Sequence, residues 1–184
     1  MSRTLSFLLN ILFLGSSLLL SSQTAEAPKV KEPNKITEVV TTDSLPASEL
    51  LKRAVNFVKT ENPKYTKTNG VTAGSKAECN ITFPVKPKEL NPVCDYTGKI
   101  MMKVIIECKD SKYKYIIENI RHVSTGGKTS IGNIDNIIAE CGSMIMPDLT
   151  LKKLRGEAYK YAGSVANDIK TAMKNAVDNS KGDW

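Results

Sequence analysis

Side chains that could perform acid–base chemistry are sparse in this sequence. His122 is the single histidine, and a histidine base needs a nucleophile and an orienting group within reach. The sequence nominates neither group. We therefore expect a structural histidine, at the surface or at the edge of a strand, in place of a catalytic one.

Carboxylates offer another route to hydrolysis, because a pair of them can act as acid and base. Such a pair is diagnostic only when the separation of its two groups is known, and a sequence does not give that distance. An exported hydrolase with a carboxylate site is therefore the alternative function that we retain. Its candidates are scattered along the chain: Asp95, Asp110, Asp135 and Glu140.

Four cysteines could form two disulfides in an exported chain, with three possible connectivities. They are Cys79, Cys94, Cys108 and Cys141, and they lack the close paired spacing of a zinc site. Alternation along the strands described below places Cys79 and Cys108 on the same sheet face, and the other two fall in loops. We predict that Cys79 lies close to Cys108 on a neighbouring strand. Unpaired core thiols are the alternative for these two.

A glycine-rich segment, GGKTS at 126–130, has a weak likeness to a phosphate-binding loop. That motif requires a glycine at the position of His122 and a strong helix after the lysine, and the sequence has neither. We interpret the segment as a loop, and we expect the protein to use no cofactor and no metal.

The net charge is +7, from 26 basic and 19 acidic side chains. The basic residues are spread over the whole chain, and no basic run is interleaved with aromatic residues. The charge therefore indicates general solubility, and we expect no nucleic-acid partner.

The N-terminal segment is typical of a secretory signal peptide, because Arg3 is followed by an apolar stretch and then by small polar residues. We predict a signal peptide over 1–22, a disordered linker over 23–34, a single domain over 35–179 and a flexible tail over 180–184. The mature protein is expected to be periplasmic or extracellular. The rest of the sequence has no apolar run of ~18 residues, so we predict no membrane span in the mature protein.

The strongest strand signal is a hairpin over Gly98–Val123, in which two runs of β-branched and aromatic residues flank a polar turn. Strands are also predicted over Ile36–Thr42 and Lys76–Phe83, with a short strand in the polar stretch before the latter. Amphipathic periodicity predicts helices over Ala47–Lys59 and Leu151–Ala176. The order β-α-β-β-β-β-α gives an α+β domain with both helices on one face of an antiparallel sheet.

The returning strand of the hairpin needs a β-bulge. Tyr113 and Tyr115 share one face early in the strand, whereas the apolar Ile120 would lie on the other. The sequence does not fix where the bulge falls. Residues 123–147 are expected to form a loop, with a short helix over Ile134–Glu140.

Two segments resemble an exported bacterial family of unknown function, mostly from Bacteroidota, with a TATA-binding-protein-like fold. They are the first strand and helix, ITEVVTTDSLPASELLKRAVNFV, and the return of the hairpin, KYKYIIENIRH. The resemblance covers residues 36–177 and implies a half-saddle with the order of elements given above. It implies no catalytic residue, and a fold alone does not imply DNA binding.

The leading interpretation of function is a non-catalytic exported domain that binds a protein, a peptide or an envelope component. The outward residues of the central strand include apolar side chains, and exposed apolar surface often marks an interaction site. The alternative is that the linker or the 123–147 loop covers this face. Neither the ligand nor the oligomeric state follows from the sequence. The candidate partner surface is Met101, Lys103 and Ile105, extended by Tyr113 and Tyr115 if the bulge turns them outward.

Overall fold

Six strands and two helices form in the described part of the chain. The computed structural model describes residues 35–86, 96–124, 130–136 and 148–175, all within the unit Glu32–Trp184. The predicted signal peptide and linker lie outside the described residues. The elements are β1 (Ile36–Thr41), α1 (Ala47–Lys59), β2 (Thr66–Ala73), β3 (Lys76–Val85), β4 (Gly98–Lys109), β5 (Lys112–Ser124), β6 (Gly132–Asn133) and α2 (Asp148–Lys174).

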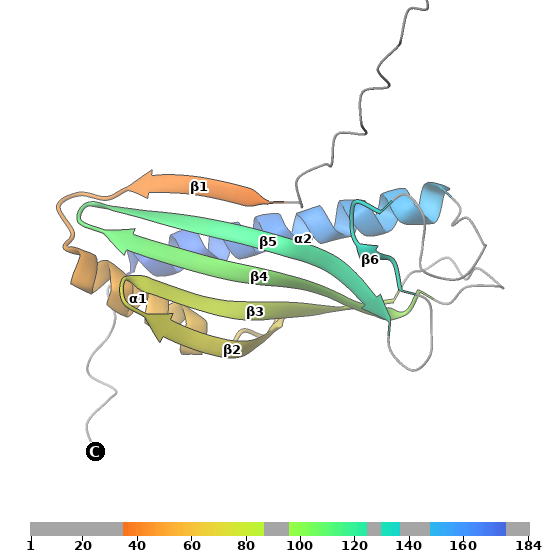
Figure 1. Cartoon of the computed structure of the whole chain (residues 1–184), viewed down its shortest axis with the longest axis horizontal. Helices are drawn as coiled ribbons and strands as arrows, with labels where there is room; N and C mark the ends of the chain where they lie inside the picture. The colour runs from red at the N-terminus through yellow and green to blue at the C-terminus, as the bar shows by residue number, and fades with distance from the viewer. Residues whose placement is uncertain (1–34, 87–95, 125–129, 137–147, 176–184) are drawn as a thin grey trace, which may run out of the picture. The chain divides into compact units, whose positions relative to one another are not determined.

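The strands form one antiparallel sheet in the order β1-β5-β4-β3-β2. The two-residue β6 pairs with the far end of β5, along the same edge as β1. Figure 1 shows both helices behind the sheet, on one face. The predicted α+β class and helix placement are therefore confirmed. The short β6 is an addition that the sequence did not indicate, because two residues carry no periodicity.

Strict alternation along β3 and β4 separates the two faces of the sheet. The residues that face the helices are buried and apolar, and they build the core with the apolar stripes of α1 and α2. We call the opposite face, which neither helix covers, the outer face. In β4 it carries Lys99, Met101, Lys103, Ile105, Glu107 and Lys109.

The bulge of β5 lies at Asn119. Met101 pairs with Arg121 and Lys103 pairs with Glu118, so Asn119 and Ile120 together oppose Met102. The backbone of Asn119 has a φ of 55°, a left-handed conformation that asparagine tolerates better than most residues. The bulge reverses the alternation, so Ile120 faces the helices, whereas in a regular strand it would share the outer face with Glu118.

Basic side chains from other elements satisfy the carbonyl groups at both helix C-termini. The buried Arg53 of α1 donates from Nη1 to the carbonyl oxygens of Met173 (2.9 Å) and Lys174 (3.0 Å) at the end of α2. Lys67 of β2 donates to the carbonyl oxygen of Phe57 and, at 2.8 Å, to that of Thr60 at the end of α1. Each cation also complements the negative end of a helix dipole.

The start of α1 is fixed to the β4–β5 turn. The N–H of Ala47 donates to Asp110 Oδ1 at 2.8 Å, and the N–H of Ser111 donates to the carbonyl oxygen of Leu45 at 2.8 Å. A helix start has unpaired N–H groups, and an acidic acceptor there is stabilising. The turn of the predicted hairpin therefore determines where α1 begins.

The amphipathic pattern predicted over Leu151–Ala176 is confirmed where the side chains of α2 are described. Leu154, Ala158, Val165 and Ile169 are buried against the sheet, whereas the side chain of Leu151 lies outside the described residues. The predicted short helix is wrong at its start, because Ile134 and Asp135 form a turn. Its remaining residues, 137–140, are not described.

No described helix combines the length and the apolar character that crossing a lipid bilayer requires. The longest one, α2, is amphipathic, with one buried stripe and otherwise polar positions.

Replacing Leu154 with alanine should lower the free energy of unfolding by about 2–5 kcal/mol, because the side chain is 1% exposed and its removal leaves a cavity. Chemical denaturation measures this loss. Lys160→Ala, on the exposed side of the same helix, should change stability by less than about 0.5 kcal/mol. Equal stability of Leu154→Ala and the parent protein would contradict the packing of α2 on the sheet.

Candidate functional site

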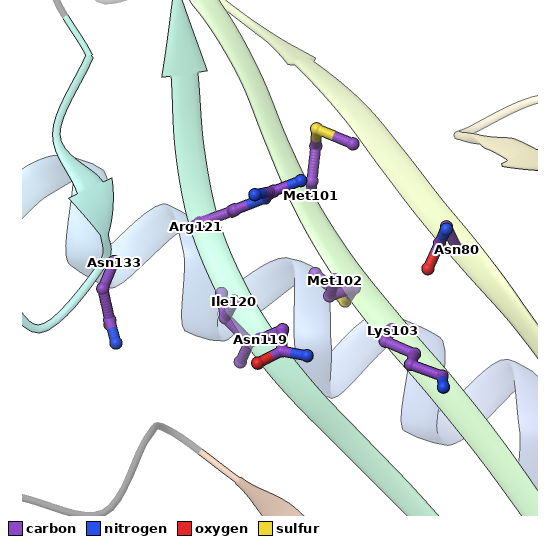
Figure 2. Close-up of a pocket in the computed structure, with 8 residues that line it drawn as sticks. All are labelled: Asn80, Met101, Met102, Lys103, Asn119, Ile120, Arg121 and Asn133. Carbon is purple, nitrogen blue, oxygen red and sulfur yellow. The ribbon is translucent and has the colours of Figure 1, made fainter.

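A pocket of about 390 Å³ opens on the outer face, beside the bulge of β5. Figure 2 shows Arg121 reaching from β5 toward Met101 on β4, with Asn119 and Lys103 beside them and Asn80 on β3. The lining residues are Asn80, Met101, Met102, Lys103, Asn119, Ile120, Arg121 and Asn133. The outward side chains among them are amides, cations and one thioether, which favour hydrogen bonding to a polar, anionic ligand.

The cations at this pocket differ in their pairing. Lys103 Nζ lies 3.0 Å from Glu78 Oε2, so its charge is largely compensated. Arg121 and Lys99 are exposed and have no carboxylate partner within the described residues. Arg121 pairs in the ladder with Met101, and Lys99 lies two residues from Met101 on the same face, so the Cα atoms of Arg121 and Lys99 are diagonal neighbours at ~7–8 Å.

A ladder of ion pairs joins the three central strands on the half of the outer face near the β4–β5 turn. Glu107 of β4 lies 2.7 Å from Lys76 Nζ on β3 and 2.6 Å from Lys114 Nζ on β5. The two lysines, Lys114 first, lower the pKa of Glu107 to about 2 by hydrogen bonding. This carboxylate stays ionised at any physiological pH, and its two partners are occupied.

The strands gather cations on the outer face that are far apart in the sequence. Seven basic side chains and three carboxylates of β3, β4 and β5 point outward there. The spread of basic residues along the chain had indicated general solubility only, and the sheet changes this interpretation. The basic residues are Lys76, Lys99, Lys103, Lys109, Lys112, Lys114 and Arg121, and the acidic ones are Glu78, Glu107 and Glu118.

His122 holds the strand that supplies Asn133 to the pocket. The imidazole is fully buried (0% exposed), and its Nδ1 accepts a hydrogen bond from the N–H of Ile131 at 3.3 Å. The other nitrogen, Nε2, must then carry the proton, and it lies 2.9 Å from the carbonyl oxygen of Tyr96. Gly98 leaves room for this ring, because a Cβ there would lie 3.0 Å from Nε2 and 2.3 Å from the carbonyl oxygen of Val123.

The environment of His122 corrects the expectation of an exposed histidine. The sequence predicted a residue at the surface or at a strand edge, but the bulge at Asn119 turns the ring into the protein. Burial lowers the pKa of this imidazole below its ordinary value of 6.5. The ring therefore acts as a neutral hydrogen-bonding brace between β5, β6 and Tyr96.

The structure places three of the five residues of the predicted partner surface on the outer face. Met101 and Lys103 line the pocket, and Ile105 follows them on the same face. The proposed extension by Tyr113 and Tyr115 is wrong, since both are 2% exposed and face the helices. The bulge comes after these tyrosines, so it cannot turn them outward.

The hydroxyl group of Tyr115 reaches the rim of the helix-covered face. It donates to Glu38 of β1, and the same carboxylate lies 2.7 Å from Lys170 Nζ on α2. Burial, with the neighbouring carboxylate, raises the pKa of Tyr115 above 10. Lys170, together with the tyrosine hydroxyl, lowers the pKa of Glu38. These contacts join β1 to α2 and give the tyrosine a structural role.

The predicted proximity of Cys79 and Cys108 is wrong, although both face the core on neighbouring strands. Cys79 pairs with Val104, four residues before Cys108. At ~3.3 Å per residue the two lie roughly 13 Å apart along the strands, beyond the ~7 Å that a disulfide allows. Both are free buried thiols, and burial raises the pKa of each to about 11. Cys94 and Cys141 lie outside the described residues.

The candidate carboxylates of the alternative hydrolase do not converge where they are described. Asp110 precedes β5 and caps α1, whereas Asp135 follows β6 at the opposite end of β5. That separation is roughly 30 Å along the strand. Asp95 and Glu140 are not described. Within the described segments, no three histidine, cysteine or acidic side chains gather as metal ligands would.

Six of the eight pocket residues were not predicted from the sequence: the core residues Met102 and Ile120, and the outward residues Asn80, Asn119, Arg121 and Asn133. Asn119 offered a usable signal, because an asparagine inside a β-branched strand often has a positive φ. A bulge predicted at Asn119 would have placed Arg121 on the outer face. Asn133 reaches the pocket through β6, which no sequence pattern indicated.

Two solved structures have a similar fold. A DUF4468 family protein from Bacteroides ovatus matches with a TM-score of 0.54 and 10% identity, over 83% of this chain and 92% of that chain. A TBP-like protein from Parabacteroides distasonis matches with a TM-score of 0.54 and 15% identity, over 79% of this chain and 95% of that chain.

The comparisons bear on the fold alone. No protein-family model matches the sequence, and no curated protein matches it either. The two structures confirm the predicted TBP-like α+β fold and the resemblance to Bacteroidota proteins of unknown function. At such low identity, function has to be argued from the site.

We expect the imidazole of His122 to titrate below pH 6.5 in the folded protein. Because folding favours its neutral form, its contribution to stability is complete above pH 6.5 and is lost as the pH falls through the folded-state pKa. NMR of the single histidine measures the pKa, and denaturation at each pH measures the stability. His122→Gln should reduce this pH dependence. An imidazole that titrates at or above 6.5 would contradict the buried, neutral ring.

Proposed function

We propose that this protein is an exported, non-catalytic binding module that holds a protein, peptide or envelope component on the outer face of its sheet. Export is supported by the N-terminal pattern of a charged residue, an apolar stretch and small polar residues. The arrangement of the sheet supports a ligand on the outer face. Both helices cover one face of the sheet, and the pocket lies on the opposite, outer face.

The observation that carries this proposal is the uncompensated Arg121 at an open pocket. A guanidinium group usually pairs with a carboxylate when one is available, and acidic side chains lie nearby on the same face. Glu78 and Glu107 are engaged by lysines instead. Arg121 is therefore free to meet an external group, beside the apolar side chain of Met101.

A binding role accounts for the described carboxylates better than a hydrolytic one. Asp110 accepts a hydrogen bond at the start of α1, and Glu107 is bound by two cations. A general acid would need a raised pKa, whereas Glu107 has a lowered one. Hydrolysis remains the competing hypothesis, and a screen with ester, peptide and glycoside substrates tests it. Turnover that is abolished by Asp135→Asn would overturn the binding proposal.

Met101→Asp combined with Ile105→Asp should abolish affinity capture of envelope partners, because the pair places negative charge in the pocket and along the outer face. The thermal midpoint should change little, since both side chains are only partly buried. Asn167→Asp is the control, because it adds a negative charge at an exposed position of α2, on the other side of the sheet. It should capture partners as the parent protein does.

Two outcomes would contradict the proposed binding face. If the double variant unfolds, the two side chains belong to the core. If the folded double variant captures the same partners as the parent protein, the ligand binds elsewhere. Circular dichroism of each variant before capture separates these cases.

A further inference from the structure

We propose that the ligand of the outer face is an acidic peptide, bound in an extended form, with one of its carboxylates on Arg121. This inference rests on the proposed function and specifies the chemistry of its ligand. The charge of the face supports an anionic partner, because seven cations and three carboxylates point outward from β3, β4 and β5.

Arg121 offers the geometry that a carboxylate requires. Its side chain is exposed and lies over the pocket beside Met101 (Figure 2). The planar guanidinium can donate two parallel hydrogen bonds to one carboxylate, which a lysine cannot do. Lys99, diagonal to it in the β4–β5 ladder, adds a second positive charge that has no carboxylate partner among the described residues. Arg121 and Lys99 therefore present two cations to a negatively charged ligand at the pocket end of the face.

The remaining outward side chains of the pocket suit a peptide backbone. Asn80, Asn119 and Asn133 come from three different strands, and each amide carries donors and an acceptor. Backbone N–H and C=O groups of an extended peptide need both kinds of partner. Met101 lines the same pocket and provides a flexible apolar surface that adapts to different side chains.

The outward side chains of the described strands favour neither nucleic acids nor membrane surfaces as the anionic ligand. Single-stranded nucleic acids are commonly bound by stacking bases on aromatic rings, and membrane surfaces by tryptophan or tyrosine at the interface. Among the described strands, the outward positions carry no aromatic residue. The rings of Phe83, Tyr113 and Tyr115 all face the core.

The test is the binding of fluorescein-labelled oligoglutamate peptides of ten residues, measured by fluorescence anisotropy at fixed ionic strength. Oligoglutamine of the same length is the uncharged probe. Arg121→Gln should weaken oligoglutamate binding about tenfold or more, as expected for loss of a charge-assisted pair. Arg121→Lys should restore only part of the affinity. Lys109→Gln, which removes a cation of the same face that has no ion-pair partner in the described part of the chain, should have less than a threefold effect.

Each other outcome overturns the inference. If Arg121→Gln and Lys109→Gln weaken oligoglutamate binding equally, the attraction is diffuse and Arg121 does not form a specific carboxylate-binding site. Equal binding of oligoglutamine, or tighter binding of single-stranded DNA or phosphatidylglycerol vesicles, would assign another ligand class. If oligoglutamate does not bind, yet partner capture is still lost in the Met101 and Ile105 double variant, the acidic-peptide inference fails and the proposed binding face stands. If oligoglutamate does not bind and the double variant still captures its partners, both proposals are rejected.

Discussion

The bulge at Asn119 is the constraint on which both faces of the sheet depend. It places two residues of β5 opposite Met102 and reverses the alternation of every side chain after it. Ile120 and His122 consequently enter the core, and Arg121 reaches the outer face. A regular strand would instead bury the arginine and expose the histidine. The left-handed backbone of Asn119 is thus connected with both the stability of the domain and the character of its open face.

The helix-covered face is held together by polar contacts at the ends of its elements as well as by its apolar core. Arg53 joins α1 to the end of α2, Lys67 joins β2 to the end of α1, and Asp110 joins the β4–β5 turn to the start of α1. Hydrogen bonds to charged groups contribute more than neutral ones. These polar side chains are therefore committed to structure, whereas Arg121 and Lys99 are not.

Much of the fold could be predicted because its signals are local. Alternation in the hairpin and the spacing of Leu154, Ala158 and Val165 in α2 depend on the chain's own periodicity. The site could not be predicted to the same extent, because it depends on register. The four-residue offset between Cys79 and Cys108 and the position of the bulge follow from strand pairing. A pattern of residue types leaves that pairing open.

The central claim is that the outer face at Met101 receives the ligand while the helix-covered face does not. Methyl NMR of protein labelled at its methionines tests this directly, because Met101 faces outward and Met102 and Met173 are buried. Titration with the captured partner should shift the Met101 signal in a saturable way and leave that of Met173, on α2, nearly unchanged. A dominant shift at Met173, or equal shifts at Met101 and Met173, would contradict the account.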